Sequence, residues 1–235
     1  MIDYTNRSYK KELLDRGDIP FVDIAKNMLE LDFINACLGG HSITIGGFKK
    51  FITKQKNIYV CEIGCGGGDN LRAIYNYCTR KKIVIKLEGI DINQDCIAFA
   101  KRRSGIGNVN FIVSDYKLVD FKEQKPDIIF SSLFCHHFTD DELVEMLQWM
   151  KQNAVEGFFI NDLHRHRLAY HFIKIATKLF SKSYLVKNDA PLSVLRGFRK
   201  KEWEKIFDKA GIRNYSIAWK WAFRWLVRST PVPPL

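Results

Sequence analysis

The sequence predicts an α/β fold, a doubly wound and mainly parallel sheet with helices on both faces. Three observations predict it. Short apolar runs alternate with helical stretches between residues 57 and 163, a glycine-rich turn follows the first run directly, and the final residues alternate aromatic and basic side chains. Apolar strands that alternate with helices are typical of a parallel sheet covered on both sides.

The N-terminal residues 1–56 are predicted to form a helical extension, or lid, and residues 57–235 the main domain. Asp18 and Pro20 mark a helix start, and apolar residues then recur with a near-helical period. Gly39 and Gly40 supply the stop.

The central part predicts five strands, each apolar on both faces, with helices between them. A helix is expected after each of the first two strands and after the fourth. The strands are expected at 58–64, 82–90, 109–113, 127–133 and 157–162, and the helices at 70–80, 94–103 and 140–151.

The last third predicts a helix over 167–181, a loop over 188–198, a second helix over 199–210 and a final hairpin. The strict alternation of the hairpin places Trp219, Trp221 and Trp225 on the inward side. The basic residues of this stretch also fall at helical spacing, so periodicity alone leaves a basic helical face open. These residues are Lys220, Arg224 and Arg228.

Composition narrows the class of protein. The 235 residues are 46% hydrophobic and lack an apolar run long enough to cross a membrane, and the six cysteines form no CxxC pair. We therefore expect a cytoplasmic protein with reduced thiols. Residues 161–235 hold 16 Lys and Arg against 5 Asp and Glu, so the net charge of +11 resides there. An anionic partner and simple solvation explain this excess equally well.

The strongest motif is the glycine turn that follows the first strand. Glu62 precedes Gly64, Gly66 and Gly68, a GxGxG spacing that disfavours the usual dinucleotide and P-loop motifs. Glycines there let the backbone approach a ligand closely. Asp91 ends the second strand, where an acid can accept hydrogen bonds from both hydroxyls of a ribose.

Four ordered motifs within about residues 57–165 resemble the class I S-adenosylmethionine-dependent methyltransferases: EIGCGGG, GIDIN, Ser114-Asp115-Tyr116 and PDIIFSSLFCHHF. The resemblance implies a Rossmann-like, seven-stranded sheet with a C-terminal antiparallel hairpin, and S-adenosylmethionine as cofactor. It implies that the glycine turn contacts the methionyl part, Asp91 the ribose and Asp115 the adenine amino group. The implied cofactor-binding residues are Glu62, Gly64, Cys65, Gly66, Gly68, Asp91, Ile92, Asp115, Tyr116, Ser131, Ser132 and Leu133.

The fourth motif also bears on the methyl acceptor. It lacks the Asn/Asp-Pro-Pro-aromatic and Pro-Cys sequences of the family's amine and pyrimidine methylases, and looks like the quinone, phenol and natural-product branch. A histidine is the expected general base, His136 first and His164 second, since both follow strand ends where such sheets bind ligands. Metal ligation by the histidines and Asp162 is considered, but no metal is expected.

The resulting prediction is O-methylation of a small aromatic or lipid-like acceptor that bears a hydroxyl group. The apolar segments 8–54 and 163–198, the latter a helical insert, are expected to cover the site and favour such an acceptor. C-methylation of a quinone-type ring and RNA modification are the alternatives. A nucleic-acid partner is disfavoured, weak peripheral membrane association is expected, and the oligomeric state is left open.

Overall fold

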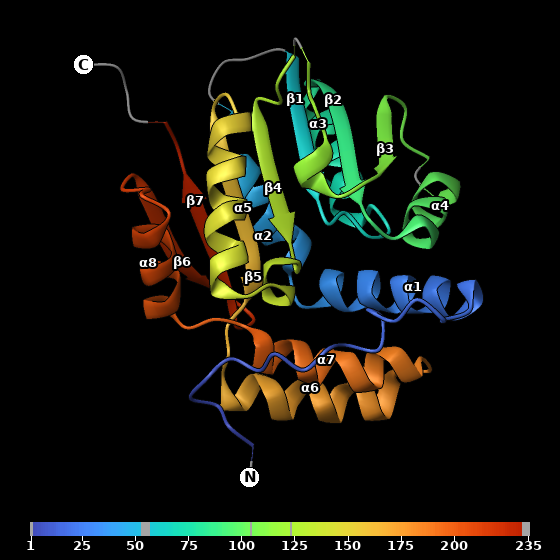
Figure 1. The fold of residues 1–235 in the computed structure, drawn as a ribbon. Helices are drawn as coiled ribbons and strands as arrows, with labels where there is room; N and C mark the ends of the chain where they lie inside the picture. The colour runs from blue at the N-terminus through green and yellow to red at the C-terminus, as the bar shows by residue number, and fades with distance from the viewer. Residues whose placement is uncertain (1, 53–56, 104, 123, 232–235) are drawn as a thin grey trace.

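A seven-stranded sheet in the order β3-β2-β1-β4-β5-β7-β6 forms the centre of the molecule (Figure 1). The computed structural model describes residues 2–52, 57–103, 105–122 and 124–231. The first five strands are parallel and β7 joins β5 antiparallel. The fold class is therefore the predicted one. The strands are β1 Asn57–Ile63, β2 Val84–Asp91, β3 Val109–Val113, β4 Ile128–Ser132, β5 Gly157–Leu163, β6 Tyr215–Lys220 and β7 Arg224–Ser229.

Helices cover both faces of the sheet, which explains why β4 is buried along its whole length. One core layer joins Ile129 and Phe158 to α5 and α8, and the other joins Val60 and Leu87 to α2, α3 and α4. The helices are α1 Phe21–Cys37, α2 Gly40–Phe48, α3 Asp69–Lys81, α4 Gln94–Arg103, α5 Asp140–Asn153, α6 Arg167–Phe180, α7 Tyr184–Arg196 and α8 Lys200–Lys209, with 3-10 turns η1 Tyr116–Leu118 and η2 Cys135–His137.

The N-terminal region is helical as predicted, with a break at Gly39, whose φ of 75° ends α1 and starts α2. Phe48 at the end of α2 is fully buried in the core of the sheet. The predicted boundary at residue 56 lies in segment 53–56, outside the described residues. The division into lid and main domain stays a prediction.

The loop predicted over 188–198 is wrong, because most of it belongs to α7. Pro191, which removes a backbone donor, lies inside the helix. Three apolar residues of α7 are at most 5% exposed, namely Leu185, Val186 and Val194. Burial of this face together with the Ser183 cap offsets the cost of the proline.

The predicted hairpin is present as β6 and β7, but its side chains differ from the expectation. Trp219 and Trp221 are 47% and 70% exposed, and only Trp225 is buried. Arg224 is just 3% exposed, so it does not belong to a basic surface. The predicted inward packing of all three tryptophans is therefore wrong, because Trp221 falls in the turn between the strands and β6 is the edge strand.

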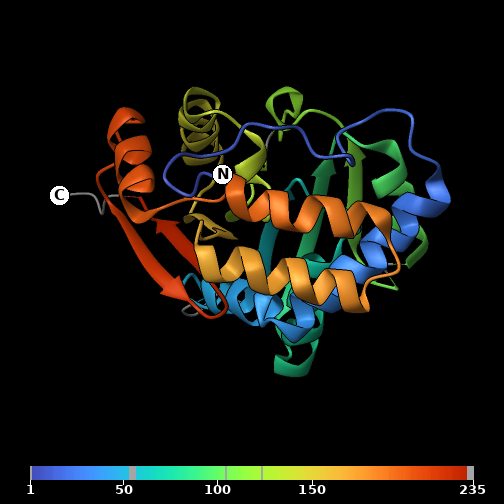
Figure 2. The same ribbon diagram turned by 90° about the horizontal axis from the view of Figure 1, so that it is seen from below.

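Helices α1, α6 and α7 form a separate layer below the carboxyl ends of the parallel strands (Figures 1 and 2). The N-terminal segment crosses this layer, where Ser8 N donates to Leu195 O. None of the helices in the described ranges has the length and apolar run that crossing a membrane would require.

Candidate active site

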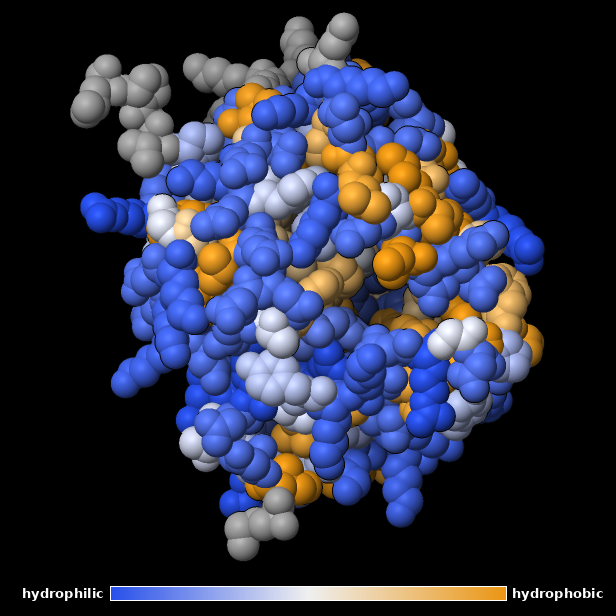
Figure 3. Space-filling model, in the orientation of Figure 1, coloured by the Kyte–Doolittle hydropathy of each residue, from blue (hydrophilic) through white to orange (hydrophobic). Residues whose placement is uncertain are grey.

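A cavity of about 560 Å³ lies between the carboxyl ends of the strands and the layer of α1, α6 and α7. On the face drawn in Figure 3 the surface is hollowed near its centre, and hydrophobic residues border the hollow. The predicted glycine turn, α1, α6, α7 and the hairpin turn at Phe223 all contribute to the lining. This volume suits a drug-sized ligand. The cavity therefore is the candidate site.

The glycine turn forms one wall. Gly64 and Gly66 have φ values of 66° and 49°, in the left-handed region that favours glycine. A Cβ on Gly64 would lie 2.2 Å from the ring of Phe134. Gly66 N donates to Asp91 Oδ2 at 2.8 Å, and Asn93 N donates to Asp91 Oδ1 at 2.9 Å. Asp91 therefore fixes the turn and still has lone pairs for a ligand.

Glu62 lies beneath the turn and is only 1% exposed. Neither of its carboxyl oxygens has a hydrogen-bond partner among the described residues. Burial raises the pKa of Glu62 well above its usual value, and the neighbouring Asp69 raises it further. A buried, unpaired acid that lines a cavity suits a ligand that brings donors or positive charge.

The other predicted cofactor residues divide into two groups. Cys65, Ile92, Ser132 and Leu133 line the cavity, together with Glu62, Gly64, Gly66 and Asp91. Gly68, Asp115, Tyr116 and Ser131 are not part of the lining.

Two residues of this second group have structural partners instead. The Asp115 carboxylate caps η1 by accepting from Lys117 N at 3.0 Å. Tyr116 is buried against Trp149, with ring centroids 5.1 Å apart. An adenine-contacting role for these two residues therefore stays a prediction.

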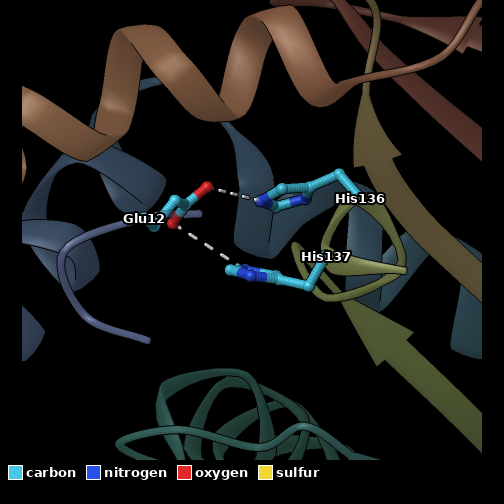
Figure 4. A group of neighbouring side chains, drawn as sticks. All are labelled: Glu12, His136 and His137. Atoms are coloured by element: carbon cyan, nitrogen blue, oxygen red, sulfur yellow. Dashed lines mark ion pairs between the residues drawn. The ribbon is translucent and has the colours of Figure 1, made fainter. Parts of the chain in front are cut away.

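His136 lies on the cavity wall between two carboxylates. Its Nδ1 donates to Asp162 Oδ1 at 2.8 Å, and its Nε2 lies 3.6 Å from Glu12 Oε1. Figure 4 shows Glu12, from the N-terminal segment, facing both His136 and His137 of η2. Burial alone would lower the pKa of His136, but the charges and hydrogen bonds of Asp162 and Glu12 raise it to about 9.

Two buried arginines hold the turn that carries His136. Arg196 of α7 donates from Nε to the carbonyl of His136 at 3.0 Å and from Nη2 to that of His137 at 2.9 Å. Arg7 of the N-terminal segment donates to the carbonyl of Phe138 at 2.8 Å. The position of His136 thus depends on segments far apart in the sequence.

The structure does not bring His164 into the cavity. It lines a separate surface pocket with His166 and Arg199, and its Nδ1 accepts from Trp219 Nε1 at 3.2 Å. Burial, followed by the charges of His166 and Arg165, lowers the pKa of His164 to about 4. In this position His164 does not contact a ligand that is bound in the main cavity.

Two clusters in the described ranges have the residue types of a metal site, Glu12 with both histidines of η2 and a second cluster of Asp32, His41 and Asp69. Asp32 is already paired with Arg72 at 2.6 Å and with Arg103 at 2.9 Å. Glu12 accepts from Ser193 Oγ at 2.6 Å. Both clusters are therefore satisfied by ion pairs and hydrogen bonds without a metal ion.

Sequence reasoning missed two partners of His136. Asp162 was considered only as a metal ligand, although it ends the strand beside β4 and so lies at the same edge of the sheet. No sequence pattern marks Glu12, because it precedes the first predicted helix. Its burial, with 5% of its surface exposed, results from tertiary contacts.

Comparison with known proteins agrees with this geometry. Residues 60–157 match a family model described as a methyltransferase domain. No curated protein sequence shows significant similarity to the chain.

Several solved structures share the fold. The plantazolicin methyltransferase BpumL, solved with S-adenosylhomocysteine, has a TM-score of 0.61 at 19% identity, over 85% of this chain and 73% of that chain. The magnesium protoporphyrin IX methyltransferase of Synechocystis has a TM-score of 0.52 at 14% identity, over 92% and 90%. Human N-acetylserotonin methyltransferase, solved with S-adenosylmethionine, has a TM-score of 0.61 at 14% identity, over 90% and 56%.

At these identities the solved structures establish the shared fold, and the family model establishes the domain. The glycine turn, the acid at the end of β2 and the sheet order occur together in this chain. Residues 60–157 therefore form a methyltransferase domain, and the chain shares its fold with methyltransferases solved with S-adenosylmethionine or S-adenosylhomocysteine.

Proposed function

We propose that this enzyme methylates a hydroxyl oxygen of a small aromatic or lipid-like molecule, with His136 as general base. The observation that carries the proposal is the pair of His136 and Asp162, 2.8 Å apart on the cavity wall. A buried carboxylate behind Nδ1 orients the ring so that Nε2 lies at the cavity wall beside Glu12, and once His136 is deprotonated Nε2 carries the free lone pair. That nitrogen can accept the proton of an acceptor hydroxyl.

S-adenosylmethionine supplies an electrophilic methyl group when bound. Among the residues of the chain, Asp91 would hold the ribose and Glu62 the ammonium group, since the buried Glu62 oxygens lack a hydrogen-bond partner among the described residues. The Gly64–Gly66 turn lets the backbone come close without side-chain clashes. His136 would take the proton of the acceptor hydroxyl while the hydroxyl oxygen attacks. General-base catalysis of this kind commonly contributes ~10²–10⁴-fold to the rate.

The lining of the cavity supports an apolar acceptor. Part of it consists of aliphatic and aromatic side chains from α1, from the residue that follows α1 and from α6, namely Leu31, Ile34, Leu38, Phe172 and Ile173. Such walls favour an aromatic ring or acyl chain, while the polar groups orient it. Two solved structures with this fold are methyltransferases named for small molecules, magnesium protoporphyrin IX and N-acetylserotonin, which also favours a small acceptor.

A panel of phenols, naphthols and hydroxyquinones, incubated with S-adenosylmethionine, tests the proposal. Mass spectrometry should find S-adenosylhomocysteine and an O-methylated product from at least one apolar hydroxyl compound. Transfer to RNA oligonucleotides with none to the panel would contradict the proposal. Methylation at a ring carbon would favour the C-methylation alternative, in which the same histidine removes a proton from the ring.

A further inference from the structure

Helix α6 exposes a row of large apolar side chains to solvent. Leu168, Phe172, Ile175 and Leu179 are 64%, 56%, 60% and 68% exposed, at spacings of four, three and four residues. We call these four residues the α6 stripe. The opposite side of the helix is buried in the fold through Ala169 and Ile173. The stripe is therefore a second apolar face that the described part of the chain does not cover.

Helix α1 extends this apolar surface. Val22, Leu29 and Phe33 are 70%, 47% and 68% exposed and recur at helical spacing. The Glu30 carboxylate of the same helix accepts from Ser181 Oγ and from Lys182 N, just after α6. Figures 1 and 2 show α1 and α6 in the same lower layer of the molecule.

Within the segment that carries the stripe the charges are of one sign, and the nearby acid Glu30 belongs to α1. Residues 163–188 contain no Asp or Glu. Five of their basic side chains are exposed: Arg167, Lys174, Lys178, Lys182 and Lys187. An apolar helical face bordered by cations is typical of a helix that lies in the interface of an anionic bilayer. A second copy of the chain would instead place lysines against lysines, and an RNA would leave the apolar side chains uncovered.

The stripe is continuous with the cavity. Phe172 is both half-exposed on the surface and part of the cavity lining, next to Ala169 and Ile173. Ile34 and Leu38 of α1 line the same region. The exposed apolar stripe and the apolar part of the cavity lining therefore meet at Phe172.

We propose that the α6 stripe docks on an anionic phospholipid bilayer, with Lys174 and Lys178 at the headgroups. Entry of the acceptor from that bilayer rests on the proposed function, whereas the docking itself does not. This proposal places the basic surface on α6 and not on the hairpin, because Arg224 of the hairpin is buried in the protein.

Co-sedimentation with vesicles tests the docking. We expect the protein to bind phosphatidylcholine vesicles that contain about one third phosphatidylglycerol, and to bind pure phosphatidylcholine much less. Ile175→Gln with Leu179→Gln should weaken binding at least about 10-fold, since both side chains lose apolar contact with the lipid. Leu118→Gln is the matched control, because Leu118 is 80% exposed on η1, outside α1 and α6.

A double charge reversal on α6 provides a second test of the docking. Lys174→Glu with Lys178→Glu should lower binding about 10-fold and remove most of its salt dependence. Lys201→Glu with Lys205→Glu, exposed on α8, makes the same charge change and should have little effect.

Calorimetry with S-adenosylhomocysteine on the same variants separates docking from the proposed function. The stripe variants should keep the affinity of the wild type for this ligand. Equal vesicle binding by wild type and the Ile175/Leu179 variant would overturn the proposal, as would retention on RNA with none on anionic vesicles. Failure of the acceptor panel, with docking intact, would instead count against the proposed function alone.

Discussion

Asp162 lies 2.8 Å from Nδ1 of His136, although 26 residues separate the two in the sequence. Asp162 is fully buried and His136 is 3% exposed. Parallel strands β4 and β5 bring them to one edge of the sheet, and Leu163 N donates to the same carboxylate at 2.7 Å. This pair orients a histidine that lines the cavity between β4 and the N-terminal segment.

Replacement of His136 should affect turnover and not cofactor binding. We expect His136→Ala to lower kcat at least ~10²-fold, since a general base acts only in the transition state. Affinity for S-adenosylhomocysteine should stay within about threefold. His164→Ala is the matched control and should leave kcat/KM nearly unchanged, because His164 lies in the separate surface pocket. If steady-state kinetics showed a large loss of kcat in His164→Ala and none in His136→Ala, His164 would be the general base.

Replacement of Glu12 should shift the pH profile. The charge of Glu12 helps to raise the pKa of His136 to about 9, so the base becomes free only at alkaline pH. Glu12→Gln removes that charge, and the rise of kcat/KM should move to lower pH with its plateau retained. The profile is measured with an acceptor that does not ionise in this range. If the inflection of the kcat/KM profile stayed at the same pH in Glu12→Gln, a group other than His136 would control the profile.

Substitution of the glycine turn should cost stability or cofactor affinity. Gly64→Ala places a Cβ 2.2 Å from the Phe134 ring at a φ of 66°, so strain and a clash combine. We expect loss of at least about 2 kcal/mol in unfolding free energy or of most cofactor affinity. Gly46→Ala in α2 has open space around its Cβ and should be neutral or stabilising. Urea unfolding and calorimetry compare the two, and equal behaviour would contradict the packing at Gly64.

The charge on His136 predicts a pH-dependent stability. Its pKa is raised from about 6.5 in the unfolded chain to about 9 in the folded protein. The folded protein therefore binds this proton more tightly, and the stabilisation is complete below about pH 6.5 and is lost as pH rises towards 9. Thermal unfolding should show Tm falling over this window. His136→Gln should flatten the fall, whereas His171→Gln, at an exposed site, should not.

Local patterns predicted the central sheet well. The alternation of apolar runs and helices predicted β1 to β5 to within a few residues, and the predicted glycine turn is present, with positive φ at Gly64, Gly66 and Gly68. Two predictions in the last third are wrong for one reason. Segment 188–198 and the tryptophans were judged from the local sequence, whereas burial of α7 and the edge position of β6 determined the outcome.

The candidate site was predicted only where its residues follow strand ends. Asp91 and His136 were found in this way, whereas Glu12, Arg7 and Arg196 act through contacts between distant segments. No periodicity marks a side chain that closes a site from another part of the chain. His164 also follows a strand end, but it lines the other pocket. Directly after β5, the backbone at His164 forms a bridge to Phe198.

Calorimetric titration with S-adenosylhomocysteine tests the central claim, that the glycine turn and Asp91 form the cofactor site, most directly. The wild type should bind with roughly micromolar affinity, and Asp91→Ala should lose most of it, since charge-assisted hydrogen bonds of ~1.5–3 kcal/mol each are removed. His136→Ala should bind like the wild type. Unchanged affinity in Asp91→Ala, or tight binding of NAD by the wild type, would contradict the account.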